Sequence, residues 1–172
     1  MKRALTGAGE GYLRGHAASR SGILRRMGSA LDALAPVLLA FPTSQSPLAP
    51  DNTMAIERLT SAIESIASPD LESVMVGPDV SFRAEYRGVS GLIEGWSDWL
   101  SPYESFRMEV EDLIESRDVL VTCVRQFGTP MGGGPELEAE SAAVWWLRDN
   151  RLVRVEFHLD RDAAMRAAGL AE

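Results

Sequence analysis

Four consecutive segments with the residue pattern of β-strands fill most of the second half of the chain. They cover residues 106–115, 118–128, 136–147 and 152–159, and short turn-forming stretches rich in Gly, Pro, Asp and Asn separate them. Strands joined by such short links pair antiparallel, because a parallel crossover needs a dozen or more residues. The sequence therefore predicts an antiparallel meander as the largest part of the fold.

Helical patterns lie before and after this meander. Apolar side chains recur at steps of three and four over residues 56–66, which predicts a helix at about 54–67. The same spacing over residues 92–103 predicts a second helix, which Ser90 can cap and Pro102 can end. We also expect a short helix at 71–75, a strand at 80–86 and a closing helix from Arg161, which Asp160 can cap. Helices segregated from an antiparallel sheet define an α+β fold.

The first 53 residues differ in charge from the rest of the chain. They carry six basic and three acidic side chains, a net charge of +3, whereas residues 54–172 hold 11 basic and 22 acidic ones, a net charge of −11. Four prolines interrupt or follow the one apolar stretch of this part, at residues 31–41. We therefore interpret residues 1–53 as an N-terminal extension outside the core fold, and residues 54–172 as the folded domain.

Composition excludes several classes of protein. The formal charge of −8 and the isoelectric point near 4.8 argue against a nucleic-acid partner, and no apolar stretch reaches the ~18 residues of a membrane span. The single Cys123 cannot form an intrachain disulfide and is expected to be a small buried apolar residue. With two histidines and one cysteine there is no zinc-ligand spacing. We therefore expect a cytoplasmic protein without metal or cofactor.

The predicted element order and four stretches resemble the SnoaL-like branch of the NTF2-like superfamily. The stretches are PDVSF at 78–82, GVSGL at 88–92, LRDNRLV at 147–153 and the closing segment 159–170. The resemblance covers residues 54–170. It implies a strongly curved antiparallel sheet wrapped round three helices into a cone with one interior pocket, and a homodimer formed through the outer face of the sheet.

The resemblance leaves two classes of function open, because this fold hosts isomerases, cyclases, epoxide hydrolases, dehydratases and non-enzymatic binding proteins. The first is a cofactor-independent isomerase, cyclase or hydrolase acting on a small, largely apolar molecule. The alternative is a non-catalytic small-molecule-binding protein or dimeric assembly module. Four Trp, five Phe and seven Met residues provide enough apolar bulk to line a cavity as well as a core.

Alternation along the strands predicts which side chains face this pocket. Val124 and Gln126 share one face of their strand, and Val155 and Phe157 share one face of the last strand. Trp145 and Trp146 are adjacent in sequence and must point to opposite faces of their strand, so that one lies inward and the other outward. The predicted ligand-binding residues are Trp96, Trp99, Val124, Val155 and Phe157.

Candidate catalytic residues are Gln126, His158 and Tyr86. In the epoxide hydrolases of this fold, inward carboxylates occupy the places that Gln126 and Phe157 take here, and neither side chain can remove a proton from water. Tyr86 is either an acid or oxyanion donor at the pocket mouth or a rim tyrosine with a hydrated hydroxyl.

His158 and Glu156 lie two residues apart on one strand face and leave two interpretations open. They form either a general base, or a solvated or dimer-facing pair in which Arg154 or Arg125 neutralises Glu156.

Overall fold

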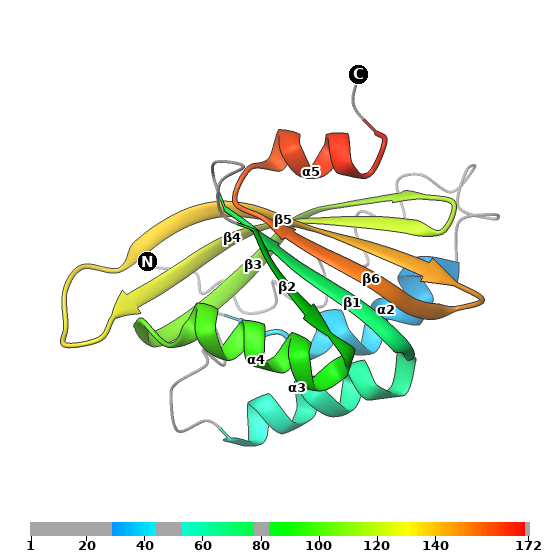
Figure 1. Ribbon diagram of the computed structural model, residues 1–172. Helices are drawn as coiled ribbons and strands as arrows, with labels where there is room; N and C mark the ends of the chain where they lie inside the picture. Colours follow the sequence, from blue (N-terminus) through cyan, green and yellow to red (C-terminus); the bar gives the residue numbers. More distant parts are fainter. Residues whose placement is uncertain (1–28, 44–52, 78–82, 171–172) are drawn as a thin grey trace, which may run out of the picture.

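A computed structural model describes residues 29–43, 53–77 and 83–170, which contain one sheet of six strands (Figure 1). The strands are β1 (Ala67–Val76), β2 (Arg83–Arg87), β3 (Tyr103–Ser116), β4 (Val119–Pro130), β5 (Leu137–Arg148) and β6 (Arg151–His158). Their order across the sheet is β2-β1-β6-β5-β4-β3. Neighbouring strands run antiparallel, except for β1 and β6, which are parallel.

Helices cover both faces of this sheet (Figure 1). The helices α2 (Ser29–Ala40), α3 (Thr53–Ile66) and α4 (Gly88–Leu100) lie on one side, and α5 (Arg161–Ala167) lies on the other. We call the face that carries α2, α3 and α4 the inner face, and the face under α5 the outer face. The predicted α+β class and the predicted antiparallel meander, β3 to β6, are confirmed.

Local turn chemistry explains why the meander was predictable. Asp149 and Asn150 join β5 to β6 with φ angles of 52° and 60°. Positive φ at both central residues is the signature of the two-residue hairpin turn that matches strand twist, and Asp and Asn tolerate this conformation. The short link thus pairs β5 with β6 by local geometry alone.

The helix predicted at 71–75 is wrong, because these residues belong to strand β1. The segment pairs on one side with β2 and on the other with β6, so both of its edges are satisfied within the sheet. Leu71 and Val74 point to opposite faces and are both buried. When a short segment is apolar on both faces, its apolar residues show no regular spacing along the sequence. The sequence pattern alone therefore cannot distinguish a buried strand from a helix.

Residues 29–43 also correct the expected boundary at residue 54. The helix α2 buries Ala30, Leu34 and Val37 in the main core, and Phe41 packs against the same cluster. These positions follow the spacing i, i+4, i+7 and i+11, the pattern of one helix face, although Pro36 lies within the helix. Residues 1–28 and 44–52, which make up the rest of the expected extension apart from residue 53, lie outside the described residues.

A carboxylate from β3 holds the start of α2. The backbone N–H groups of Ala30 and Leu31 both donate to Glu115 Oε1, at 3.1 and 3.4 Å. The first N–H groups of a helix have no partner within the helix, and the positive end of the helix dipole favours an anion. Glu115 therefore acts as a cap from a distant part of the sequence.

Removing this cap should weaken the docking of α2. We expect Glu115→Ala to lower the free energy of unfolding by about 1 kcal/mol, and Glu115→Gln by less, because its amide oxygen can still accept the bonds. Urea denaturation of each variant measures the change. Glu104→Ala, at an exposed position on the same strand, is the matched control. Equal losses for Glu115→Ala and Glu104→Ala would contradict the capping role.

The outer face is closed in part by α5. A second cluster of buried residues lies there, comprising Val121, Cys123, Ala142, Val144 and Ala164. Burial raises the pKa of the Cys123 thiol, as expected for an apolar environment. Trp145 is fully buried against the inner helices, whereas Trp146 packs beside the α5 cluster, so the predicted opposition of these two side chains is confirmed.

The homodimer expected through the outer face stays a prediction. Among the residues that the structure describes, no helix combines the length and the apolar character needed to cross a membrane.

Candidate functional site

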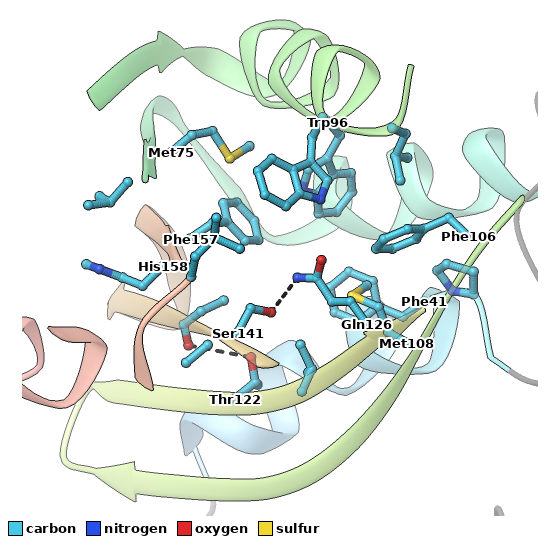
Figure 2. A pocket seen from close by; sticks show the side chains of 18 of the residues that line it. Phe41, Met75, Trp96, Phe106, Met108, Thr122, Gln126, Ser141, Phe157 and His158 are labelled. Atoms are coloured by element: carbon cyan, nitrogen blue, oxygen red, sulfur yellow. Dashed lines mark hydrogen bonds between the residues drawn. The ribbon is translucent and has the colours of Figure 1, made fainter. Parts of the chain in front are cut away.

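A pocket opens between the inner face of the sheet and the helices (Figure 2). Its volume is about 800 Å³ when the space at its open mouth is included. Side chains from α3, from α4, from the two residues that follow α2 and from five strands meet there. The lining consists of Phe41, Pro42, Leu59, Met75, Val76, Trp96, Trp99, Leu100, Phe106, Met108, Thr122, Val124, Gln126, Ser141, Ala142, Ala143, Phe157, His158 and Leu159.

Aromatic rings from distant segments form one wall of the pocket. The Trp96 ring lies 5.9 Å from the Phe157 ring in an edge-on arrangement and 5.7 Å from the Phe41 ring. The Phe157 ring in turn stands edge-on to Trp145, at 5.8 Å. Such edge-to-face contacts stabilise aromatic pairs beyond the area that they bury. The rings therefore hold one another in place and form a preformed apolar surface.

Three uncharged polar side chains interrupt this apolar lining on β4 and β5. Thr122 and Gln126 come from β4 and Ser141 from the adjacent β5. The Gln126 side-chain N–H donates to the Ser141 hydroxyl. Thr122 accepts a bond from the Trp145 indole N–H at 3.1 Å and donates to the Ala143 carbonyl at 3.5 Å. Thr122 is thus already satisfied by its own neighbours.

Ionisable groups are scarce in the pocket. Among the described residues that line it, His158 is the one with an ionisable side chain, and none is Asp or Glu. Figure 2 shows the His158 imidazole directed away from Gln126 and the centre of the cavity. Its Nε2 lies 3.1 Å from Glu156 Oε2, while its Nδ1 has no hydrogen-bond partner within the described residues. His158 therefore belongs to the wall of the pocket and to a charged cluster behind it.

This cluster is buried rather than solvated. Glu156 is 7% and His158 6% exposed, and Arg154 Nε donates to Glu156 Oε1 at 3.0 Å. The hydrogen bond from His158, assisted by Arg154, lowers the pKa of Glu156 to about 2 against the opposing effect of burial. The ionised carboxylate must accept, so His158 Nε2 is the donor in this contact. Of the two arginines considered for Glu156, Arg154 is the one that binds it.

Arg125 instead pairs with carboxylates on its own part of the outer face. It donates to Glu111 on β3 and lies 3.5 Å from Glu138 on β5. These acidic partners raise the pKa of the Arg125 guanidinium, so it stays charged at every pH of interest. Arg125 therefore plays no part in the pocket.

Tyr86 lies outside the lining. Its ring packs against α4 at Gly95, where a Cβ atom would stand only 2.9 Å from the Tyr86 ring, and its hydroxyl is 3.4 Å from Asp98 Oδ2. Burial and the neighbouring Asp98 raise the pKa of this phenol, so it is a weaker acid than an ordinary tyrosine. Tyr86 therefore packs β2 against α4 and does not line the pocket.

The structure brings most of the predicted ligand-binding residues together. Trp96, Trp99, Val124 and Phe157 line the cavity, whereas Val155 lies in the core and contributes no surface to the cavity. Sequence reasoning missed Phe41 and Pro42, although the helical spacing that leads to Phe41 was visible, and it missed Ser141, Met75 and Met108.

No group of three or more His, Cys, Asp or Glu side chains suited to a metal occurs in the described ranges.

Comparison with known proteins identifies the fold. No protein-family model matches this chain, and no curated protein matches it. Several solved structures match this chain. One of them is an NTF2-like protein of unknown function from Burkholderia pseudomallei, which is 17% identical with a TM-score of 0.57, and the match covers 81% of this chain and 97% of that one.

Two further structures carry names that bear on function. A candidate SnoaL-like polyketide cyclase from Jannaschia sp. CCS1 is 14% identical with a TM-score of 0.59, over 86% of this chain and 97% of that one. TerC, co-crystallised with polyporic acid, is 18% identical with a TM-score of 0.57, over 81% and 97%. Identities this low establish a shared architecture rather than a shared activity. The protein therefore has the NTF2-like fold, which it shares with proteins of the SnoaL-like polyketide cyclase type.

Proposed function

We propose that this protein binds a small, neutral, largely apolar molecule with aromatic character in the pocket beneath α4. The observation that carries the proposal is the lining itself, which is built from aromatic, thioether and aliphatic side chains and contains no carboxylate among the described residues. A charged ligand would lose its hydration there, and the one ionisable side chain of the described lining, His158, is directed away from the cavity centre. A neutral apolar ligand gains from leaving water.

The geometry of the aromatic wall favours a ligand with ring systems. The rings of Phe41 and Phe157 line the pocket 5.7 and 5.9 Å from the Trp96 ring, and a ligand ring can add further offset or edge-on contacts to this set. The co-crystallisation of TerC with polyporic acid supports small-molecule binding as a function available to this fold.

Catalysis is the second candidate function, and the His158–Glu156 pair is the observation that favours it. An isomerase, cyclase or hydrolase needs a group that gives or takes a proton within reach of the substrate. His158 is buried and its Nδ1 has no hydrogen-bond partner within the described residues, but the imidazole points away from the cavity centre (Figure 2). Binding is therefore the better supported of the two functions.

A neutral fluorescent probe tests the proposal. We expect N-phenyl-1-naphthylamine to bind the full chain with micromolar affinity and to fluoresce more strongly in the apolar pocket. Phe157→Asp should weaken binding at least tenfold, because it removes a ring of the wall and leaves an unpaired carboxylate facing the ligand. Circular dichroism checks that the variant is folded.

The matched control introduces the same charge elsewhere. Leu39→Asp alters an exposed position of α2 and should leave the affinity unchanged. Equal binding by wild type and Phe157→Asp would place the probe outside this pocket and contradict the proposal.

A further inference from the structure

We infer that the ligand of this pocket carries a hydroxyl group that donates a hydrogen bond to Gln126 Oε1 and accepts one from the Ser141 hydroxyl. The inference rests on the proposed function and adds to it the chemical feature that the pocket selects. It assigns Gln126 and Ser141 as the residues that determine specificity.

The first step is the hydrogen-bond inventory of Gln126. A glutamine amide offers two N–H donors and one carbonyl acceptor. The amide nitrogen donates to Ser141, and no hydrogen bond to the carbonyl oxygen is formed within the described residues. Figure 2 shows this oxygen on the side of the amide turned from Ser141 toward Trp96, inside the cavity. The pocket thus presents one acceptor without a protein donor.

The second step concerns Ser141, which is 6% exposed and lies beside Gln126 in the pocket. Its oxygen accepts the Gln126 N–H, while its own proton has no acceptor within the described part of the chain. A buried hydroxyl that cannot use its proton loses part of its hydration without compensation. Thr122, which also lines the pocket on β4, has both its proton and its oxygen engaged. A free donor on Ser141 and a free acceptor on Gln126 therefore stand side by side.

The third step matches these two sites to a functional group. A hydroxyl is both donor and acceptor, so a single one can satisfy Gln126 Oε1 and the Ser141 proton together. An ether or a ketone can accept from Ser141 but leaves Gln126 Oε1 without a donor. An ammonium group could donate, but it would enter an apolar cavity whose described lining offers no carboxylate. Phenols and enols on an apolar ring system fit both the polar pair and the aromatic wall.

Isothermal titration calorimetry with three related probes tests the inference on the full chain. We expect 2-naphthol to bind about fivefold to tenfold more tightly than 2-methoxynaphthalene, which has the same ring system but no donor, and more tightly than 2-acetonaphthone. Gln126→Leu and Ser141→Ala should bring the ratio between naphthol and ether close to one. Thr122→Val, which removes a hydroxyl already satisfied by the protein, should preserve the ratio.

The outcomes separate this inference from the proposed function. If the three probes bind equally well, or if the ketone binds most tightly, the hydroxyl preference is wrong while the pocket remains a binding site. If the ratio survives in Gln126→Leu and in Ser141→Ala, these residues do not set the specificity. If none of the probes binds wild type, the proposed function fails and the inference falls with it.

Discussion

Leu34→Ala is expected to lower the free energy of unfolding by about 3 kcal/mol, although this residue lies in a segment whose sequence suggested an extension. Leu34 is completely buried in the main core, where α2 packs against α3 and the inner face of the sheet. Alanine would leave a cavity that the surrounding helices and strands can close only in part. Chemical denaturation followed by circular dichroism measures the loss.

The same helix supplies the control for this experiment. Leu39 is 73% exposed, so Leu39→Ala should change the stability by less than about 0.5 kcal/mol. We also expect a chain that starts at Met54 to be far less stable than the full chain, because it lacks α2 and the Phe41 ring. Equal melting temperatures for the two chains would show that α2 is dispensable and would restore the boundary at residue 54.

Lowering the pH should remove a comparable amount of stability through Glu156. The pKa of this carboxyl is about 2 in the folded protein, against an ordinary value of 4.5. A depressed pKa stabilises the fold fully above the ordinary value and progressively less as the pH falls toward the folded value. We therefore expect about 2 to 3 kcal/mol of stability to disappear between pH 5 and pH 2 from this group.

Glu156→Gln isolates this contribution. The variant should be less stable than wild type by about 2 to 3 kcal/mol at pH 7, and the difference should shrink toward zero near pH 2. Urea denaturation at a series of pH values gives both curves. Glu140→Gln, at an exposed position of the same sheet, should instead follow wild type throughout. Parallel curves for Glu156→Gln and wild type would show that the Arg154–Glu156–His158 cluster contributes no pH dependence.

Elements that depend on local chemistry were accessible from the sequence. The turn at Asp149–Asn150, the helix period of α3 and α4, and the Asp160 cap of α5 each involve residues within a few positions of one another. The cap is direct, since Asp160 Oδ1 accepts the Ala163 N–H at 2.8 Å. Short-range geometry of this kind does not depend on what packs against it, so the α+β class could be predicted from it.

The candidate site was accessible only in part. Strand alternation correctly places Val124 and Gln126 on one face and Phe157 on the pocket side. It cannot supply the register between strands, and the register sets Ser141 opposite Val124, diagonally across from Gln126. The sequence alone could therefore not identify Ser141 as the hydrogen-bond partner of Gln126. The hydroxyl preference that we infer from this pair could not be predicted from the sequence either.

Local sequence patterns specify the meander, the helix faces and the alternation that puts Gln126 and Phe157 toward the helices. Contacts between distant segments make residues 71–75 a strand, place α2 in the core and bury Glu156 and His158. The two groups of features differ in how far apart along the chain their interacting residues lie. Turns and helix periods are settled by neighbours in sequence, whereas β1 needs its partner β6 and α2 needs Glu115. The burial of Glu156 and His158 likewise needs the flanking strands β1 and β5.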